Sequence, residues 1–363
     1  MRPAKAAAHS LSSADGLALV HPEPAAQLIE PASAVASRGR PRNGVHDWMQ
    51  VRGLALRQLN RFASLEPKVL KGDDPDAVHD LRVASRRLQQ VIRLLYPDPP
   101  KEVRRALRSA KTARRVLSDV RNCDVYLTRV GKSLARRTSR RETLETVRDY
   151  LTERRAKSFE KAQRKLSKAN LPAAYIRLKE HLDWGATARL NGYVRTTGVP
   201  VLPEEFASEP LQKRVGGELV RLWREYEEQI AASRRDGEAP ALHGARIATK
   251  RLRYLLEVLD ALEVGGSSEV LTWLRALQGR LGGWHDLEVF EQMLLKMVAR
   301  PKFLRDRLET AMSIEKLVAR NRQAKKKYVE KFFALAADSA GSQRLKDWIT
   351  SRLAESSEEA AQV

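Results

Sequence analysis

The sequence predicts an all-α fold made of two similar halves, and three observations support this prediction. From Asp47 onward the apolar residues recur at the helical period of about 3.6 residues. The chain has few alternating β-branched runs and no hairpin dipeptides between them, so strands are not expected. Two basic segments, AVHDLRVASRRLQQ from Ala77 and ALHGARIATKRLRY from Ala241, share residues at matched places. Self-similarity of such long period indicates a duplicated fold.

The repeat keeps a constant offset of 164 residues over more than one segment. At this offset His79 aligns with His243, and Arg82 aligns with Arg246. The later segments LSDVRNCDVY, from Leu117, and LGGWHDLEVF, from Leu281, align at the same offset. A chance match is a poor explanation for this agreement. Each half has room for about four helices, which is the size of one helical bundle.

Composition divides the chain into five parts. Residues 1–45 are rich in Ala, Pro and Ser without a sustained period, and we predict a disordered tail there. Residues 183–209 contain Gly, Pro and Thr but no apolar helical period. We therefore predict that they link a first bundle, 46–182, to a second bundle, 210–351. The acidic end, 352–363, is predicted to fray.

The overall charge points to anionic partners. Lys and Arg number 67 against 45 Asp and Glu, which gives a net charge of +22. Such a surface attracts polyanions, so nucleic acid, anionic membrane surfaces and phosphate polymers are candidate partners. The single cysteine, Cys123, allows no disulfide within the chain and no CxxC metal site, which favours a reducing cytosol. No apolar run of about 18 residues predicts a membrane span, and we find no signal peptide.

The repeated segment separates on a helix into an apolar face and a basic face. Leu81, Ala84 and Leu88 fall on one side of the first copy, and the cations fall on the other. The basic face carries His79, Arg82 and Arg86 in the first copy and His243, Arg246, Lys250 and Arg253 in the second, whereas Arg87 and Arg251 flank the apolar stripe. Pro75 and Pro240 suit a first helical turn, so each histidine is expected near a helix N-terminus. Backbone N–H groups and the helix dipole favour an anion there.

A second basic stripe follows in the first half. Arg104, Arg108, Lys111 and Arg115 recur at i, i+4, i+7 and i+11, on one helical face. Like charges at this spacing repel by a few tenths of a kcal/mol per pair, and a lone stripe is usually a solvated face. Residues 46–182 hold 33 basic and 16 acidic residues, net +17, whereas residues 183–351 hold 28 and 23, net +5. We therefore expect the first half to bind anions more strongly.

With these segments in view, the chain resembles the CHAD family of conserved-histidine α-helical domains. The resemblance rests on VHDLRVASRRL and LHGARIATKRLRYLLE, each followed by LSDVRNCDV or LGGWHDLEV. It implies two four-helix bundles related by a pseudo-two-fold axis around a shared basic groove or pore. It also implies non-catalytic binding of inorganic polyphosphate and association with polyphosphate granules in the cytoplasm. The resemblance further implies that the histidines, arginines and lysine of the two basic segments named above, Arg87 and Arg251 included, contact the anion. Arg121 and His285 match the basic position of the second element, whereas Asn122 stands where the family usually has an acid.

The chemistry of polyphosphate agrees with this interpretation. The polymer has about one negative charge per phosphate and no bases, and Arg can hold phosphate oxygens in bidentate fashion. Aromatic residues make up only 6% of the chain, whereas single-strand nucleic-acid binders rely on aromatic stacking. The strongest alternative is a basic helical protein that binds nucleic acid or the nucleoid. A third alternative is a structural granule-coat protein that acts through its tail.

Metal, cofactor and catalytic roles have little support in the sequence. His79 and His243 each lack a second ligand at a clear metal-binding spacing on the same face. We find no P-loop and no nucleophile motif. The expectation is a binding protein that has no cofactor, no metal and no enzyme activity.

Overall fold

The computed structural model describes residues 44–136, 140–184, 202–207, 210–263, 266–337 and 339–361. Nearly all of these residues lie in α-helices and none lies in a strand, which confirms the predicted all-α class. The predicted tail, 1–45, falls outside this part of the chain except for its last two residues.

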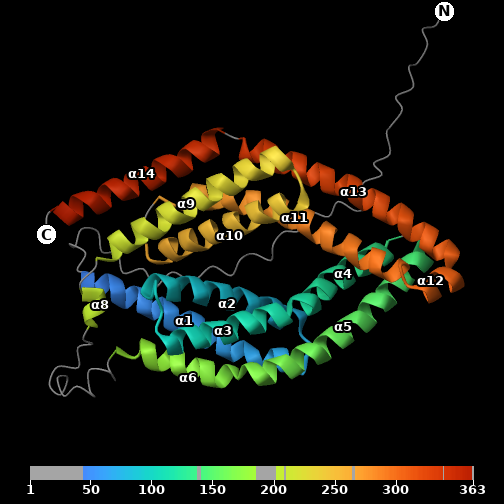
Figure 1. The fold of residues 1–363 in the computed structure, drawn as a ribbon, viewed down its shortest axis with the longest axis horizontal. Coiled ribbons are helices and arrows are strands. Elements are labelled where there is room, and N and C mark those ends of the chain that lie inside the picture. Colours follow the sequence, from blue (N-terminus) through green and yellow to red (C-terminus); the bar gives the residue numbers. More distant parts are fainter. Residues whose placement is uncertain are drawn as a thin grey trace, which may run out of the picture.

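The helices repeat in the same order in the two halves (Figure 1). The helices of the first half are α1 (Gly44–Lys71), α2 (Pro75–Leu95), α3 (Lys101–Val116), α4 (Ser118–Leu134), α5 (Arg141–Ala169) and α6 (Leu171–Leu182). After α8 (Glu204–Ala207), the second half contains α9 (Leu211–Asp236), α10 (Ala239–Ala261), α11 (Ser268–Val298), α12 (Pro301–Asp306), α13 (Leu308–Ala336) and α14 (Ser339–Ala361). The offset of 164 aligns α2 with α10, and α3 and α4 together with the single helix α11. A two-fold axis between the halves stays a prediction.

Local sequence explains where the first basic helix begins. The Asp74 side chain accepts hydrogen bonds from the backbone N–H groups of Asp76, at 2.8 Å, and Ala77, at 3.0 Å. Pro75 occupies the first turn, where its missing N–H costs nothing. The side chain of Asp74 therefore takes up two of the N–H groups that we expected to be available to an anion at this end of α2.

Three apolar cores hold the described helices together. The first core joins α1, α2, α3 and α6 with part of α5, and it includes Leu88, which is fully buried. Leu211 and Val258 of the second half also belong to this core. The second joins α9, α10 and α11 with Phe332 of α13 and Trp348 of α14. The third is shared between the halves, because α4 and α5 pack there against α11 and α13. In Figure 1 these four helices converge at one end of the molecule. The sequence predicts the first two cores but not the third.

The predicted linker and the predicted frayed end differ in part from the structure. Within 183–209, Trp184 and Phe206 are buried, and their rings lie 4.8 Å apart in the first core. The described ends of the linker thus belong to the first core. At the other terminus α14 continues to Ala361, well beyond residue 351. The residues ESSEEAA lack an apolar period, but Ala and Glu are strong helix formers, so the helix can continue.

Candidate anion-binding site

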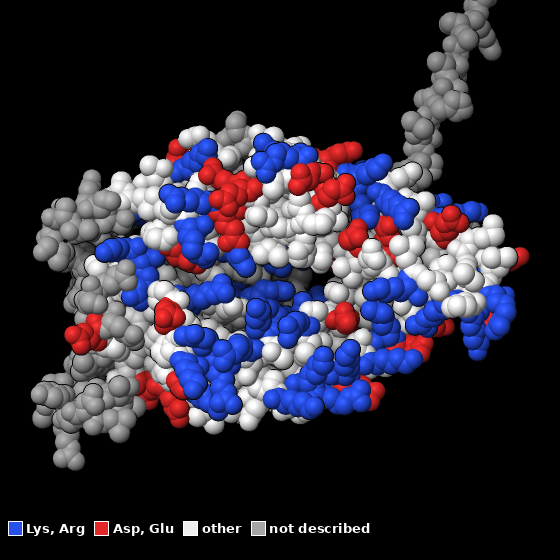
Figure 2. All heavy atoms as spheres, in the orientation of Figure 1, with Lys and Arg blue, Asp and Glu red and all other residues white. Residues whose placement is uncertain are grey.

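Cations from both halves meet in a furrow in the middle of the molecule. The space-filling view shows this furrow, with Lys and Arg side chains along it (Figure 2). Helices α2 and α10 contact one another at this boundary between the halves. The residues that face one another here form what we call the central cluster: His79, Arg82, Arg86, Arg114, Arg121, His243, Arg246, Lys250 and His285.

Charges in the central cluster act on one another across the boundary. Burial, followed by the charges of Arg86 and Arg114, lowers the pKa of Arg82 to about 9. Burial also lowers the pKa of Lys250 well below its usual value, and Arg86 is the largest of the charges that lower it further. Arg86 also lowers the pKa values of Arg114 and Arg246. Arg86 therefore lies near cations of both halves.

Neutral groups hold two of these guanidinium groups in place. Arg82 donates to the backbone carbonyl of Arg114 and, at 2.7 Å, to the hydroxyl of Ser118. Arg114 donates at 3.1 Å to the side-chain carbonyl of Gln89. Because these acceptors are uncharged, they orient the cations without neutralising them. Arg114 was not among the sequence-predicted residues, because it falls between the basic stripe and the apolar face of α3.

Carboxylates of both halves lie beside this group of cations: Asp124, Asp76 and Asp80 of the first half raise the pKa of Arg121, and so does Asp286 of the second. Asp286 of α11 pairs with Arg129 of α4 at 3.4 Å, and Tyr126 donates its hydroxyl to the backbone carbonyl of Asp286. The charge of Asp286 also raises the pKa of Arg121 and that of Arg246, although burial lowers each of them. At the offset of 164, Asp286 aligns with Asn122. A single acid from the second half thus faces cations of both halves.

The histidines are neutral members of the cluster. The rings of His243 and His285 lie 5.4 Å apart. Burial and the charge of Arg246 lower the pKa of His285 to about 3. Burial and the charge of Arg121 lower the pKa of His79 to about 4. Both rings can donate and accept hydrogen bonds at neutral pH, but they add no charge to the furrow.

We predict that acid destabilises the free protein through these two rings. The unfolded chain protonates His79 and His285 below about pH 6.5, whereas the folded chain protonates them near pH 4 and pH 3. Between these values the unfolded state binds more protons, so the free energy of unfolding decreases as the pH falls from 6.5 to 4. Thermal unfolding measured across this range checks the prediction. The His79→Gln, His285→Gln double variant should lose less stability, and an unchanged slope would contradict the assignment.

A second arginine group surrounds a buried carboxylate. Glu257 of α10 is 6% exposed and lies 3.1 Å from Arg253, 3.6 Å from Arg87 and 3.9 Å from Arg275. Arg253 and Arg87 belong to the predicted anion contacts, but their charges are directed at this acid. Removing the acid would leave three cations in a poorly solvated place, so we assign Arg87 and Arg253 a mainly structural role.

The remaining predicted residues lie elsewhere. Arg251 pairs with Glu225 of α9, and Arg104 pairs with Asp98 at 3.4 Å. Lys111 is exposed and makes no ion pair within the described residues. Arg108 and Arg115 line a separate concavity between α3, α5 and α6. Two residues of the second stripe, Arg108 and Arg115, thus line this separate concavity rather than the central cluster.

Within the described ranges, no three His, Cys, Asp or Glu side chains come together as a metal-binding group. No described helix is both long enough and apolar enough to cross a membrane.

Comparison with known proteins assigns the family. The family model described as CHAD domain matches residues 53–295, which is more than half of the chain. The chain belongs to the CHAD domain family. As a CHAD domain it also shares its fold with the crystal structure of the CHAD domain from the plant Ricinus communis. That match has a TM-score of 0.53 at 20% identity and covers 80% of this chain and 91% of the plant chain. No curated protein matches the chain.

Proposed function

We propose that this CHAD domain binds inorganic polyphosphate in the furrow between its halves, through the central cluster. The family is associated with polyphosphate-related binding in general. The observation that carries the proposal for this chain is the group of poorly solvated cations, drawn from α2 and α10, whose pKa values are lowered by burial and by one another.

A bound anion would stabilise the folded protein by offsetting the desolvation and the mutual repulsion of these cations. Each desolvated cation lowers the free energy of unfolding, and like charges nearby lower it further. Neutral acceptors orient Arg82 and Arg114, and the Nε atom of Arg246 has no hydrogen-bond partner among the described residues. A chain of phosphates would supply the missing negative charge and the missing acceptors.

The composition of the furrow favours a polymer without bases. The aromatic residues Trp284, Tyr126 and Tyr254 lie near the cluster and are 5%, 1% and 7% exposed. Buried rings offer no face on which a nucleobase could stack. Arginine, lysine and neutral histidine, by contrast, suit phosphate oxygens.

In the cell we place the protein in the cytoplasm at polyphosphate granules, as a binding protein that performs no reaction. Free polyphosphate and the granule surface present the same chemistry, so the furrow serves for both. The tail, residues 1–45, is not needed for this recognition. Deleting it while following granule localisation separates targeting by the folded domain from targeting by the tail.

The deciding experiment is a titration of the purified protein with polyphosphates of graded length at two salt concentrations. We expect affinity to increase with chain length until the furrow is filled, and to fall steeply with salt because counterions are released. Labelled duplex DNA serves as the competitor. Long-chain polyphosphate should displace the DNA at moderate salt, whereas stoichiometric displacement of polyphosphate by DNA would identify a nucleic-acid-binding protein instead.

A further inference from the structure

The first half has a second basic concavity, away from the central cluster. We call it the outer trough: it has a volume of about 1140 Å³ and lies between α3, α5 and α6. Ten cations line it: Arg105, Arg108, Arg115, Arg154, Lys157, Lys161, Lys165, Lys168, Arg177 and Arg300. The acids in its lining are Asp119 and Glu153. The trough therefore has a strong excess of positive charge.

The cations of α5 form a row along one side of the trough. From Arg154 to Lys168 they follow at intervals of three or four residues, which keeps them on one helical face over about 21 Å. Lys157 pairs with Glu153, but Lys161, Lys165 and Lys168 are exposed and make no ion pair within the described residues. Figure 2 shows Lys and Arg gathered over α5.

The second half provides an internal comparison, because the same place is filled there. At the offset of 164, Ser109 of the trough aligns with Trp273 of α11, whose ring lies against Gly341 of α14 and fills the space between these two helices. The buried residues Leu144, Val147 and Leu151 of α5 recur in α13 as Ala311, Ile314 and Val318, which is a shift of 167. At this shift Lys161, Lys165 and Lys168 align with Tyr328, Phe332 and Leu335, which pack in or against the second core.

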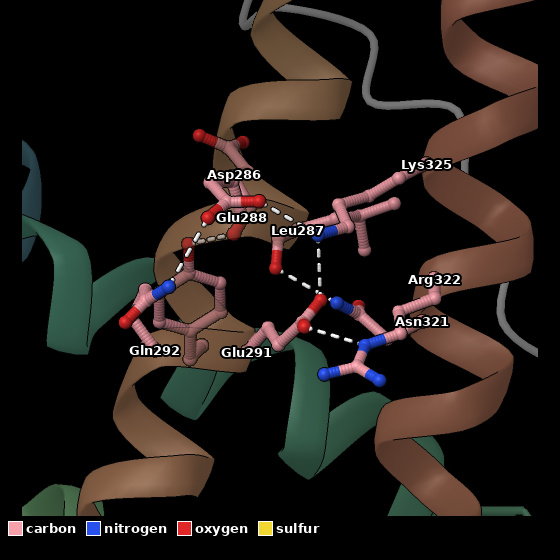
Figure 3. Close-up of polar contacts among 9 residues, drawn as sticks. Asp286, Leu287, Glu288, Glu291, Gln292, Asn321, Arg322 and Lys325 are labelled. Carbon is pink, nitrogen blue, oxygen red and sulfur yellow. Dashed lines mark hydrogen bonds and ion pairs between the residues drawn. The ribbon is translucent and has the colours of Figure 1, made fainter. Parts of the chain in front are cut away.

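Charge differs between the halves in the same way. At the shift of 167, Ser158 of α5 aligns with Lys325 of α13. Lys325 lies 2.6 Å from both Glu288 and Glu291, and Arg322 donates to Glu291 at 2.7 Å (Figure 3). At the offset of 164, Leu127 aligns with Glu291, so one of these acids is missing in the first half.

The other acid is present but is already engaged. Asp124 aligns with Glu288, and it pairs with Arg155 at 2.5 Å rather than with a trough lysine. The second half thus shows that this fold needs neither the opening nor its free cations. Their presence in the first half calls for a ligand rather than for a structural explanation.

We propose that the outer trough is a second binding site for linear polyphosphate, separate from the furrow. This inference rests on the polyphosphate binding proposed above and extends it, because a protein with two such sites can bridge two polymer chains. The row on α5 faces cations of α3 across the trough, an arrangement that suits an extended polyanion. The aromatic residue that lines it, Tyr150, is 7% exposed and lies under Arg300 at 5.0 Å. Stacking of bases therefore contributes little to recognition there.

The test reverses three charges of the row in the full chain, as Lys161→Glu, Lys165→Glu, Lys168→Glu. The matched control is Lys326→Glu, Lys327→Glu, Lys331→Glu, which reverses three exposed lysines of α13. Calorimetry with a short polyphosphate should give about two chains per wild-type protein and about one for the trough variant. Light scattering with long polyphosphate should rise as wild-type protein is added and fall about tenfold in the trough variant. A Lys→Gln version and a circular dichroism spectrum exclude misfolding as the cause.

Each outcome decides a separate question. Equal stoichiometry and equal scattering for the trough variant and the α13 control would overturn the second site. Loss of duplex DNA binding with both polyphosphate chains retained would also overturn it, because the occupant would then be nucleic acid. The Arg86→Glu variant tests the furrow independently. If it kept full binding while the trough variant lost all binding, the proposed central site would be wrong and the trough would stand.

Discussion

Replacing Arg86 by glutamate should weaken polyphosphate binding at least about 100-fold. Arg86 lies near Arg82 and Arg114 in the first half and near Arg246 and Lys250 in the second. At an effective dielectric of about 20, a unit charge about 8 Å from a phosphate contributes about 2 kcal/mol, and reversal doubles the change. Several phosphates lie within that range in any extended pose, so even a screened effect is large.

The same substitution should make the free protein more stable. A carboxylate among these cations relieves their repulsion and pairs with them, so we expect the midpoint of thermal unfolding to rise by about 2–4 °C. A fall in affinity together with a rise in stability is the signature of a site whose charges serve a ligand. A side chain that merely supports the fold would lower both quantities.

Calorimetry at low and moderate salt, together with thermal unfolding of the free variant, measures the two effects. Lys326→Glu on α13 makes the same change in net charge at an exposed position and serves as the control. Its affinity should fall by a small factor that salt removes. An Arg86→Glu protein that bound as tightly as this control would place the site elsewhere.

Helical periodicity predicts much of the candidate site, but it gives no information on tertiary contacts. A period of 3.6 residues shows which side chains share a helical face, so Arg82, Arg86, Arg246 and Lys250 could be grouped from the sequence. Periodicity does not show what stands opposite that face. Arg253 falls on the predicted basic face, yet it forms an ion pair with Glu257, one turn further on the same helix.

Contacts between distant segments were the hardest features to predict. The outer trough needs α3, α5 and α6 together, and its opening depends on Ser109 standing where the second half has Trp273. The third core has the same origin, since its apolar residues lie on α4 and α5 and on α11 and α13. On each helix alone these residues indicate only a buried face. Which helix covers that face is decided by the tertiary fold.

This shared core leads to the second large effect, which we expect from Phe290→Ala. The ring of Phe290 on α11 stacks on Tyr126 of α4 with centroids 4.8 Å apart. Removing a buried aromatic ring costs about 3–5 kcal/mol of unfolding free energy, through lost apolar burial and the cavity that remains. Denaturant unfolding monitored by tryptophan fluorescence should show this loss.

Phe290→Ala should also weaken polyphosphate binding by about tenfold, although it removes no charge. Tyr126 donates its hydroxyl to the backbone of Asp286, and Arg129 pairs with the Asp286 carboxylate, so this contact fixes α11 against α4 at one end of the furrow. If the contact loosens, the cations of α2 and α10 lose their fixed spacing.

The matched control is Phe332→Ala, because Phe332 is fully buried in the core of the second half alone. It should cost similar stability but leave affinity nearly unchanged at a temperature where both variants are folded. If both variants lost the same affinity, the contact between Phe290 and Tyr126 would contribute to stability but not to the geometry of the furrow. A selective loss in Phe290→Ala would show that the furrow owes its geometry to the core that α4, α5, α11 and α13 build together.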